Sequence, residues 1–231
     1  MTLFKKLAIA ASVICTLGSA TAQDPQPPEL PLRLCSWGDY HGTPLFVETT
    51  KGHVKVDVYN MVLSPVMKAK IPLVLYKEVK TAQGKPTYEA VLSIPVPPNR
   101  KMPLVLLRQE KDHLSAYVGE CSPEIVPYEG IAIANFSKSP LGVKVGTTKM
   151  VVPPGGDEVA KDCGGAPMEQ PYPIEAYVPD GAGASKMVYE SADVRRPSRR
   201  MFVFFYNTPD EGIGSSSITD FKEVGKDAPK P

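Results

Sequence analysis

Basic turns carry the densest group of side chains that could do chemistry. Six candidate residues stand in two such turns, namely Arg195, Arg196, Arg199 and Arg200 in RRPSRR, and Arg100 and Lys101 in NRK. Guanidinium forks match the geometry of carboxylate, sulfate and phosphate groups, so we take these residues as anion-binding candidates. We predict that the four arginines lie together on one exposed hairpin. The alternative is that the charges only protect the apolar strand after each turn from aggregation.

Cysteine is the next reactive residue type. Cys15 lies in the N-terminal apolar run, which leaves Cys35, Cys121 and Cys163 as disulfide candidates. An exported chain favours disulfides, but an odd number leaves one thiol over. Two pairings are open. Cys35 with Cys121 would clip the first domain shut if its first and last strands are neighbours, and Cys121 could instead pair with Cys163.

Patterns of catalysis and metal binding are missing from the sequence. It contains no Cys-x-x-Cys, His-Glu-x-x-His, EF-hand loop or Gly-x-Ser-x-Gly elbow. All three histidines (His41, His53 and His113) precede the second half, so a pair with Cys163 would have to cross domains. We expect no catalytic residues, no metal and no cofactor. Four aromatic residues could line a sugar-binding surface or simply pack: Trp37, Tyr172, Tyr177 and Tyr189.

The N-terminus predicts a cleaved secretory signal peptide over residues 1–22. Lys5 and Lys6 precede an apolar run from Leu7 to Leu17, and small residues end in an A-x-A frame at Ala22. The run is shorter than the ~20 residues of a membrane-spanning helix. We therefore expect a mature chain without a transmembrane span, located in the periplasm, outside the cell or on its surface. Without Lys5 and Lys6 the net charge is close to neutral, which disfavours nucleic acid as a partner.

Short β-type runs dominate the rest of the chain, and its 25 prolines disfavour long helices. Val54–Val58 alternates apolar and polar residues, the period of a half-buried strand. Gly142–Val152 predicts two strands around a Gly-Thr turn. Continuous apolar runs predict strands that are covered on both faces, at Ile71–Val79, Pro103–Arg108 and Met201–Tyr206.

Three motifs recur in the same order in both halves. The pattern Asn-x-x-x-Ser-Pro begins at Asn60 and Asn135, Tyr-Glu-small at Tyr88 and Tyr189, and Pro-x-Arg-basic-Met at Pro98 and Pro197. We interpret the order as an internal duplication and expect 54–108 to superpose on 130–206, with Asn60 over Asn135 and Arg100 over Arg199. In this interpretation each Asn ends a strand at a hairpin corner. The second copy is longer, and a segment without strands at about 153–173 accounts for much of the excess.

Together these patterns predict an all-β protein of two tandem immunoglobulin-like β-sandwiches, each with about seven strands. The expected boundaries are a Pro-rich leader at 23–33, domain 1 at 34–124, domain 2 at 125–224 and a flexible tail at 225–231. The motif order resembles that of uncharacterised, signal-bearing, tandem all-β bacterial proteins over most of the mature chain, and this resemblance implies no known activity. Two sandwiches behind a signal peptide are also similar in architecture to periplasmic pilus chaperones, whose motifs the chain lacks.

The function expected from the sequence is that of an exported, non-enzymatic binding or structural protein of the cell envelope. Its partner would be an envelope protein, an anionic glycan or a lipid. The first alternative is an assembly factor or chaperone that offers a long unpaired edge strand beside the cleft between the domains. A less favoured alternative is an enzyme acting on envelope polymers, since no nucleophile and base are visible together.

Overall fold

The computed structural model describes residues 28–111, 113–180, 184–210 and 212–222. The predicted signal peptide, residues 23–27 of the leader and the tail at 225–231 lie outside these residues. The first half contains β1 (Glu29–Ser36), β2 (Leu45–Thr49), β3 (Gly52–Val56), β4 (Met67–Lys70), β5 (Leu73–Lys80), β6 (Pro86–Ile94), β7 (Pro103–Gln109) and β8 (Leu114–Glu120). The second half contains β9 (Ile131–Asn135), β10 (Leu141–Val145), β11 (Thr148–Val152), β12 (Asp157–Ala160), α1 (Asp162–Gly165), β13 (Pro171–Pro179), β14 (Ser185–Val194), β15 (Arg199–Asn207) and β16 (Ile213–Phe221). The predicted all-β class is therefore confirmed. No helix among the described residues is long and apolar enough to cross a membrane.

The strands form four sheets of four strands, two in each half. In the first half the orders are β4-β1-β7-β8 and β3-β2-β5-β6, and in the second they are β12-β9-β15-β16 and β11-β10-β13-β14. Each strand of the first half thus has a counterpart eight strands later, with the same neighbours. In both halves the first strand runs parallel to the seventh and antiparallel to the fourth.

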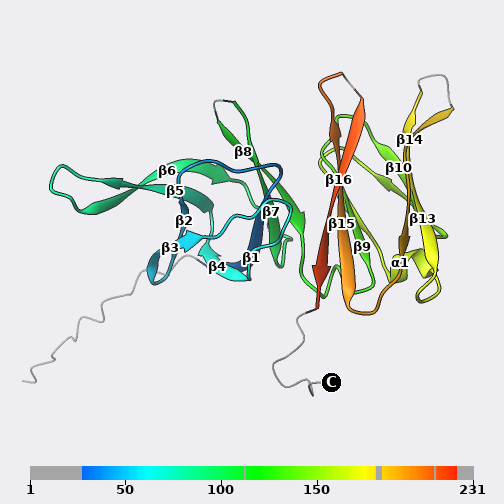
Figure 1. The fold of residues 1–231 in the computed structure, drawn as a ribbon, viewed down its shortest axis with the longest axis horizontal. Coiled ribbons are helices and arrows are strands. Elements are labelled where there is room, and N and C mark those ends of the chain that lie inside the picture. The colour runs from blue at the N-terminus through cyan, green and yellow to red at the C-terminus, as the bar shows by residue number, and fades with distance from the viewer. Residues whose placement is uncertain (1–27, 112, 181–183, 211, 223–231) are drawn as a thin grey trace, which may run out of the picture.

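This arrangement differs from the expected immunoglobulin-like one in two respects. Each half has eight strands instead of about seven. The first strand lies beside the fourth and seventh strands, whereas an immunoglobulin constant domain places its first strand beside the second in an ABED sheet. Each half is nevertheless a two-sheet sandwich, and the two halves lie side by side (Figure 1).

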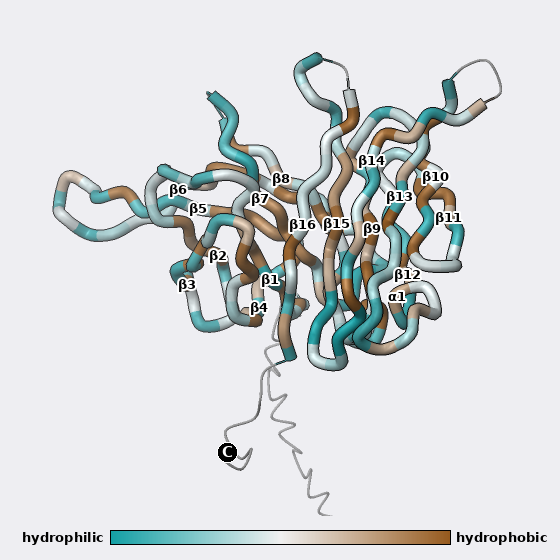
Figure 2. Tube along the Cα trace, turned by 45° about the vertical axis from the view of Figure 1, so that its right-hand side comes forward, coloured by the Kyte–Doolittle hydropathy of each residue, from teal (hydrophilic) through white to brown (hydrophobic). Residues whose placement is uncertain are grey.

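Three apolar cores hold the sheets together as four stacked layers. One core fills the first sandwich and includes Leu34, Leu75 and Val105. Another fills the second and includes Ile133, Ala176 and Phe205. The third lies between the sandwiches, where sheets β4-β1-β7-β8 and β12-β9-β15-β16 face each other. Hydrophobic residues accordingly run along the interior strands (Figure 2). We call this third core and its polar border the seam.

The two central strands show why some apolar runs are continuous. Leu104 and Leu106 of β7 face the seam while Val105 and Leu107 face their own sandwich, and all four are at most 1 % exposed. Strand β15 alternates in the same way. The prediction of burial on both faces is confirmed for these two strands. It is wrong for β5, where only Leu73 and Leu75 are buried and the hairpin with β6 projects from the body (Figure 1).

The predicted superposition of the sequence motifs is wrong. Asn135 is the last residue of β9, the first strand of its half, whereas Asn60 follows β3 and lies outside the named strands. The pairing registers place Ser36, not Asn60, at the position of Asn135, because Ser36 pairs with Leu107 and Asn135 with Phe205. Nor is Asn135 at a hairpin corner. It lies at the crossover from one sheet to the other, fully buried, and donates to the carbonyls of Ser139 and Val152.

Two segments were assigned wrongly. Residues 29–33 of the expected leader belong to β1. The segment 153–173, expected to hold no strand, contains β12, which pairs with β9, and the first residues of β13. The glycine and proline residues of this segment belong to the turns on both sides of the short edge strand β12, and they therefore hid the strand in the sequence. The glycine- and serine-rich run GIGSSS at Gly212–Ser217 belongs largely to β16, which pairs with β15 over nine residues.

Candidate functional site

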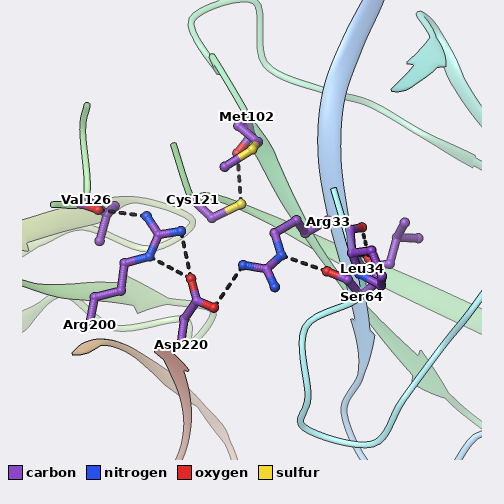
Figure 3. Close-up of polar contacts among 9 residues, drawn as sticks. Arg33, Leu34, Ser64, Met102, Cys121, Val126, Arg200 and Asp220 are labelled. Atoms are coloured by element: carbon purple, nitrogen blue, oxygen red, sulfur yellow. Dashed lines mark hydrogen bonds and ion pairs between the residues drawn. The ribbon is translucent and has the colours of Figure 1, made fainter. Parts of the chain in front are cut away.

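A buried cluster of charged side chains lies at the seam, with contributions from both halves. Arg33 of β1 donates from Nη1 to Asp220 Oδ1 of β16 at 2.9 Å. Arg200 of β15 donates from Nε to Asp220 Oδ2 at 2.8 Å, and its Nη1 donates to the Val126 carbonyl. Figure 3 shows the two guanidinium groups approaching the carboxylate from opposite sides. We call Arg33, Arg200 and Asp220 the seam cluster.

The alternation of the strands explains how these side chains meet. Leu32 and Leu34 of β1 point into the first sandwich, so Arg33 between them must point into the seam. On the other side, Arg200 and Asp220 are directly paired residues of β15 and β16. The cluster is thus fixed by backbone pairing on one side and by strand alternation on the other.

The seam cluster itself contains two positive charges and one negative charge. Two guanidinium groups, with side chains 15 % and 1 % exposed, share one carboxylate that is 7 % exposed. Glu120 is also buried, but its oxygens accept hydrogen bonds from the backbone amides of Lys101, Met102 and Ser122. Backbone amides are neutral, so Glu120 keeps its negative charge, which acts on the same Cys121 thiol as the charges of the seam cluster. Among the described residues, Asp220 is nevertheless the one carboxylate that contacts both guanidinium groups directly.

A pocket of about 290 Å³ opens beside the cluster. Its wall includes all three members of the seam cluster, together with Tyr128 and Lys222. The ring of Tyr128 lies 4.8 Å from the guanidinium carbon of Arg200, a cation–π contact. The rim is apolar.

Two exposed side chains form much of that rim, Val66 at 58 % and Phe221 at 61 % exposure. The pocket therefore combines a positively charged base with an apolar entrance. This combination suits an anionic group attached to an apolar body.

The cysteines do not form the predicted disulfides, because Cys35, Cys121 and Cys163 are all buried free thiols. Cys35 pairs across to Leu106, which pairs with Tyr117, and Cys121 lies further along beyond the end of β8. With about 4.8 Å between strands and about 3.4 Å per residue, their Cα atoms are well beyond the ~7 Å limit of a disulfide. Cys163 belongs to the second sandwich core, away from the seam. The predicted closure failed because β1 has β7, not β8, as its neighbour.

Burial determines the chemistry of these thiols. It raises the pKa of Cys35 and of Cys121 to about 12, although nearby arginines act in the opposite direction. The Cys121 thiol donates to the Met102 carbonyl, and the Cys163 thiol donates to that of Glu129. None of the three has the lowered pKa of a nucleophilic cysteine.

The structure separates the predicted arginines instead of gathering them on one exposed hairpin. Arg200 is buried in the seam cluster. Arg199 donates to Asp193 and the Val194 carbonyl, and Arg195 donates to Glu129, Asp162 and the Ala166 carbonyl. Only Arg196 is exposed. The prediction of exposure is therefore wrong, because strand β15 begins at Arg199 and draws its first side chains into the fold.

The other basic turn is likewise occupied by acidic partners. Arg100 makes a two-pronged ion pair with Asp157 of β12, at 2.5 Å and 2.7 Å, which joins the two halves. Exposed Lys101 contacts Glu124. These residues belong to the border of the seam.

The aromatic residues do not form one sugar-binding surface. Trp37 packs edge-on against Tyr117 and Tyr206 at the seam, with ring centroids 5.8 Å and 4.2 Å away. Tyr172 is buried, and Tyr189 packs on Phe205. Tyr177 lies on the outer face of the second sandwich. Across the residues that the structure describes, no group of histidine, cysteine and acidic side chains could hold a metal ion.

Sequence reasoning found Arg200 but missed Arg33 and Asp220. A signal was present for both. Arg33 interrupts the apolar run LPLRLC, and Asp220 follows the apolar Ile218 in SITDF. A lone charge at an interior position of an apolar strand needs a buried partner. What the sequence could not supply was the pairing of two strands from different halves.

Comparison with known proteins adds no family to this description. No protein-family model matches the chain, and no curated protein matches it with significant similarity.

Proposed function

We propose that this chain is an exported, non-enzymatic binding protein of the cell envelope that holds an anionic group of its ligand in the pocket beside the seam cluster. The observation that carries the proposal is that two guanidinium groups, the buried one of Arg200 and the part-buried one of Arg33, share one carboxylate. A ligand anion would give the guanidinium groups a second acceptor in direct contact. Export and the envelope location rest on the N-terminal sequence.

The class of ligand follows from the walls of the pocket. Arg33 donates from Nε to the Ser64 carbonyl and from Nη1 to Asp220, so a ligand carboxylate would accept a hydrogen bond from its Nη2. The apolar rim of Val66 and Phe221 would cover the body of the ligand, and Lys222 would strengthen the attraction at the entrance. We therefore assign the pocket to a short carboxylate with an apolar chain.

Calorimetric titration with hexanoate, hexanol and acetate tests this assignment. Hexanoate should bind the purified mature protein at one saturable site, more tightly than acetate, and hexanol should not bind. Arg33→Met should weaken hexanoate binding at least tenfold. Arg196→Met removes the same charge from an exposed position and serves as the matched control. Equal affinity of both variants, or no saturable binding to wild type, would refute the proposal.

A second candidate function is that of an assembly factor which pairs strand β16 with an extended client segment. Strand β16 is a nine-residue edge strand at the seam, and no charged or proline residue occurs from Ile213 to Thr219. Other edge strands carry charges, as in Lys68 of β4 or Lys149 of β11. Natural proteins commonly protect edges in that way.

The edge strand can be tested separately from the pocket. Replacing Ser217, whose side chain is exposed, with Lys should abolish client binding if β16 pairs with a client, and should leave hexanoate binding intact. Pull-down from envelope extract with wild-type and Ser217→Lys protein provides the comparison. Identical captured proteins would reject the edge-strand function.

We also propose that the two sandwiches arose by duplication of one immunoglobulin-like ancestor. The support is the shared strand order and the matching hairpins, in which five-residue strands flank two-residue turns in β2-β3 and β10-β11. In this register Phe46 corresponds to Gly142 and Tyr76 to Tyr177. Sequences of relatives should show higher similarity between halves in this register than in the motif register, and the reverse result would reject it.

A further inference from the structure

An open groove lies on the outer face of the second sandwich. The sheet β12-β9-β15-β16 separates the groove's own sheet from the seam. Strand pairing aligns four residues in one row across the sheet: Val151 of β11, Gly142 of β10, Tyr177 of β13 and Met187 of β14. The groove has a volume of about 590 Å³, and its lining includes Gly142, Val151 and Tyr177. Gly142 is the one residue in this row that has no side chain, so it leaves a gap between Val151 and Tyr177.

The backbone gives no reason for glycine at position 142. Its φ does not lie in the left-handed region, in contrast to Gly146 nearby. A Cβ there would meet its nearest neighbours, the Cβ and carbonyl oxygen of Tyr177, at 4.0 Å, which is ordinary contact. Glycine inside a strand costs about 0.5–1 kcal/mol relative to alanine, and it often marks close approach of a ligand. The missing side chain is therefore best explained by what the groove receives.

In the first half the position that corresponds to Gly142 carries a large side chain, that of Phe46. Phe46 pairs with Lys55 and Tyr76, just as Gly142 pairs with Val151 and Tyr177. The Phe46 ring packs edge-on against Tyr88 at 5.1 Å. Tyr88 in turn stacks on His53 at 4.0 Å, so an aromatic layer covers that face.

We propose that Gly142 marks a docking site for an aromatic side chain of a partner polypeptide, which takes the place that Phe46 fills in the first half. The two ends of the row support a polypeptide partner. Val151 is 69 % exposed and Met187 is 46 % exposed, and exposed apolar side chains around a groove are typical of protein contacts.

The paired polar neighbours of the groove argue against a sugar ligand, while Lys149 adds a positive charge to the lining. Lys144 is paired with Glu175 at 2.7 Å, and the Tyr177 hydroxyl donates to the same carboxylate. These groups already satisfy one another's hydrogen-bonding capacity, so few of them are free to bind a sugar. They form a polar border around a site that suits an apolar ring. The site is independent of the pocket at the seam.

Amide chemical shifts in ¹⁵N-labelled protein provide the test. N-acetylphenylalaninamide should give saturable shifts at Gly142, Val151 and Tyr177, whereas N-acetylalaninamide and N-acetylglucosamine should not. Gly142→Phe should fill the groove from within and abolish these shifts. Arg33→Met should leave them unchanged, which separates this site from the seam pocket.

Two further variants protect the test against a failure to fold. Val151→Ser with Met187→Ser changes only exposed side chains and should weaken binding of the aromatic probe at least fivefold. Phe46→Gly should create a second site of the same kind in the first half. Shifts that persist in Gly142→Phe, equal shifts with the alanine amide, or a stronger response to the sugar would overturn the proposal.

Discussion

At the scale of single residues, the seam cluster shows how position changes the role of a charge. Arg196 and Arg200 belong to one short basic segment, yet the first is exposed and the second is 2 % exposed. The exposed guanidinium is solvated and contributes little. The buried one depends on Asp220, the Val126 carbonyl and the Tyr128 ring.

Replacement of Asp220 should reveal this dependence. Asp220→Asn leaves buried Arg200 and part-buried Arg33 without their carboxylate, and breaking a buried pair such as Arg200–Asp220 costs about 3–5 kcal/mol. Urea unfolding should show this loss, and added hexanoate should restore more stability in the variant than in wild type. Glu124→Gln, which removes the exposed partner of Lys101, serves as the control with an unchanged midpoint. A variant as stable as wild type would show that the charges of the cluster are solvated.

The buried thiols predict a dependence of stability on high pH. Burial raises the pKa of Cys35 and Cys121 from 9.0 to about 12 in the folded protein. Between these two pH values the unfolded chain loses the thiol protons while the folded protein keeps them. Their stabilising contribution is complete below pH 9 and is lost as the pH rises towards 12. Urea unfolding of wild type and of Cys35→Ala with Cys121→Ala, between pH 8 and pH 11, should show a steeper decline for wild type. Parallel declines would contradict the raised pKa values.

At the scale of secondary structure, the sequence predicted individual strands better than it predicted which residues of the two halves correspond. The hairpin over Gly142–Val152 and the doubly buried strands β7 and β15 follow from local residue patterns. The predicted alignment of the two halves was wrong because it matched turn motifs, whereas the equivalent positions are defined by the pairing of the strands. In the pairing registers Met102 corresponds to Arg200, one position away from the motif alignment that matched Lys101 with Arg200. A shift by one residue reverses which face each side chain covers.

The turn α1 is an element that composition alone could not place. Its backbone carries positive φ at Asp162, Cys163 and Gly164, and the Gly164 carbonyl accepts hydrogen bonds from the amide and hydroxyl of Thr147. The turn therefore docks on the β10-β11 hairpin. Glycines in this segment suggested a loop without structure, but they permit this close approach.

Two adjacent glycines allow that docking to be measured. A Cβ on Gly164 would lie 1.8 Å from the Val145 carbonyl oxygen, whereas on Gly165 the nearest atom, Thr147 Oγ1, would be 3.5 Å away. Both have positive φ, so alanine should cost about 1–2 kcal/mol at Gly165 and distinctly more at Gly164. Thermal unfolding of the two variants gives the comparison. Equal losses would mean that α1 moves away from the hairpin without penalty.

At the scale of the whole molecule, the seam joins two sandwiches that each possess a core of their own. The sequence predicted two β-sandwiches, and the structure contains two four-stranded sheets in each half. It did not predict the face-to-face packing of their central sheets, since that contact depends on side chains far apart in the chain, such as Leu106 and Phe204. Ion pairs between Arg33 and Asp220 and between Arg100 and Asp157 border this contact. We infer that the two halves behave as one rigid body, which would hold the seam pocket in a fixed shape.

This rigidity predicts a single cooperative unfolding transition for wild type. Because the seam core is shared, neither half can unfold without exposing apolar surface on the other, and calorimetric and van't Hoff enthalpies should agree. Ala134→Asp buries a charge in the seam and should split unfolding into two transitions, since the separate cores of both sandwiches stay intact. Ala176→Asp places the same charge in the second sandwich core and should unfold that half, with only the transition of the first half remaining. Two independent transitions in wild type would show that the seam is too weak to couple the halves, and the pocket beside it would then lack the fixed geometry on which anion binding depends.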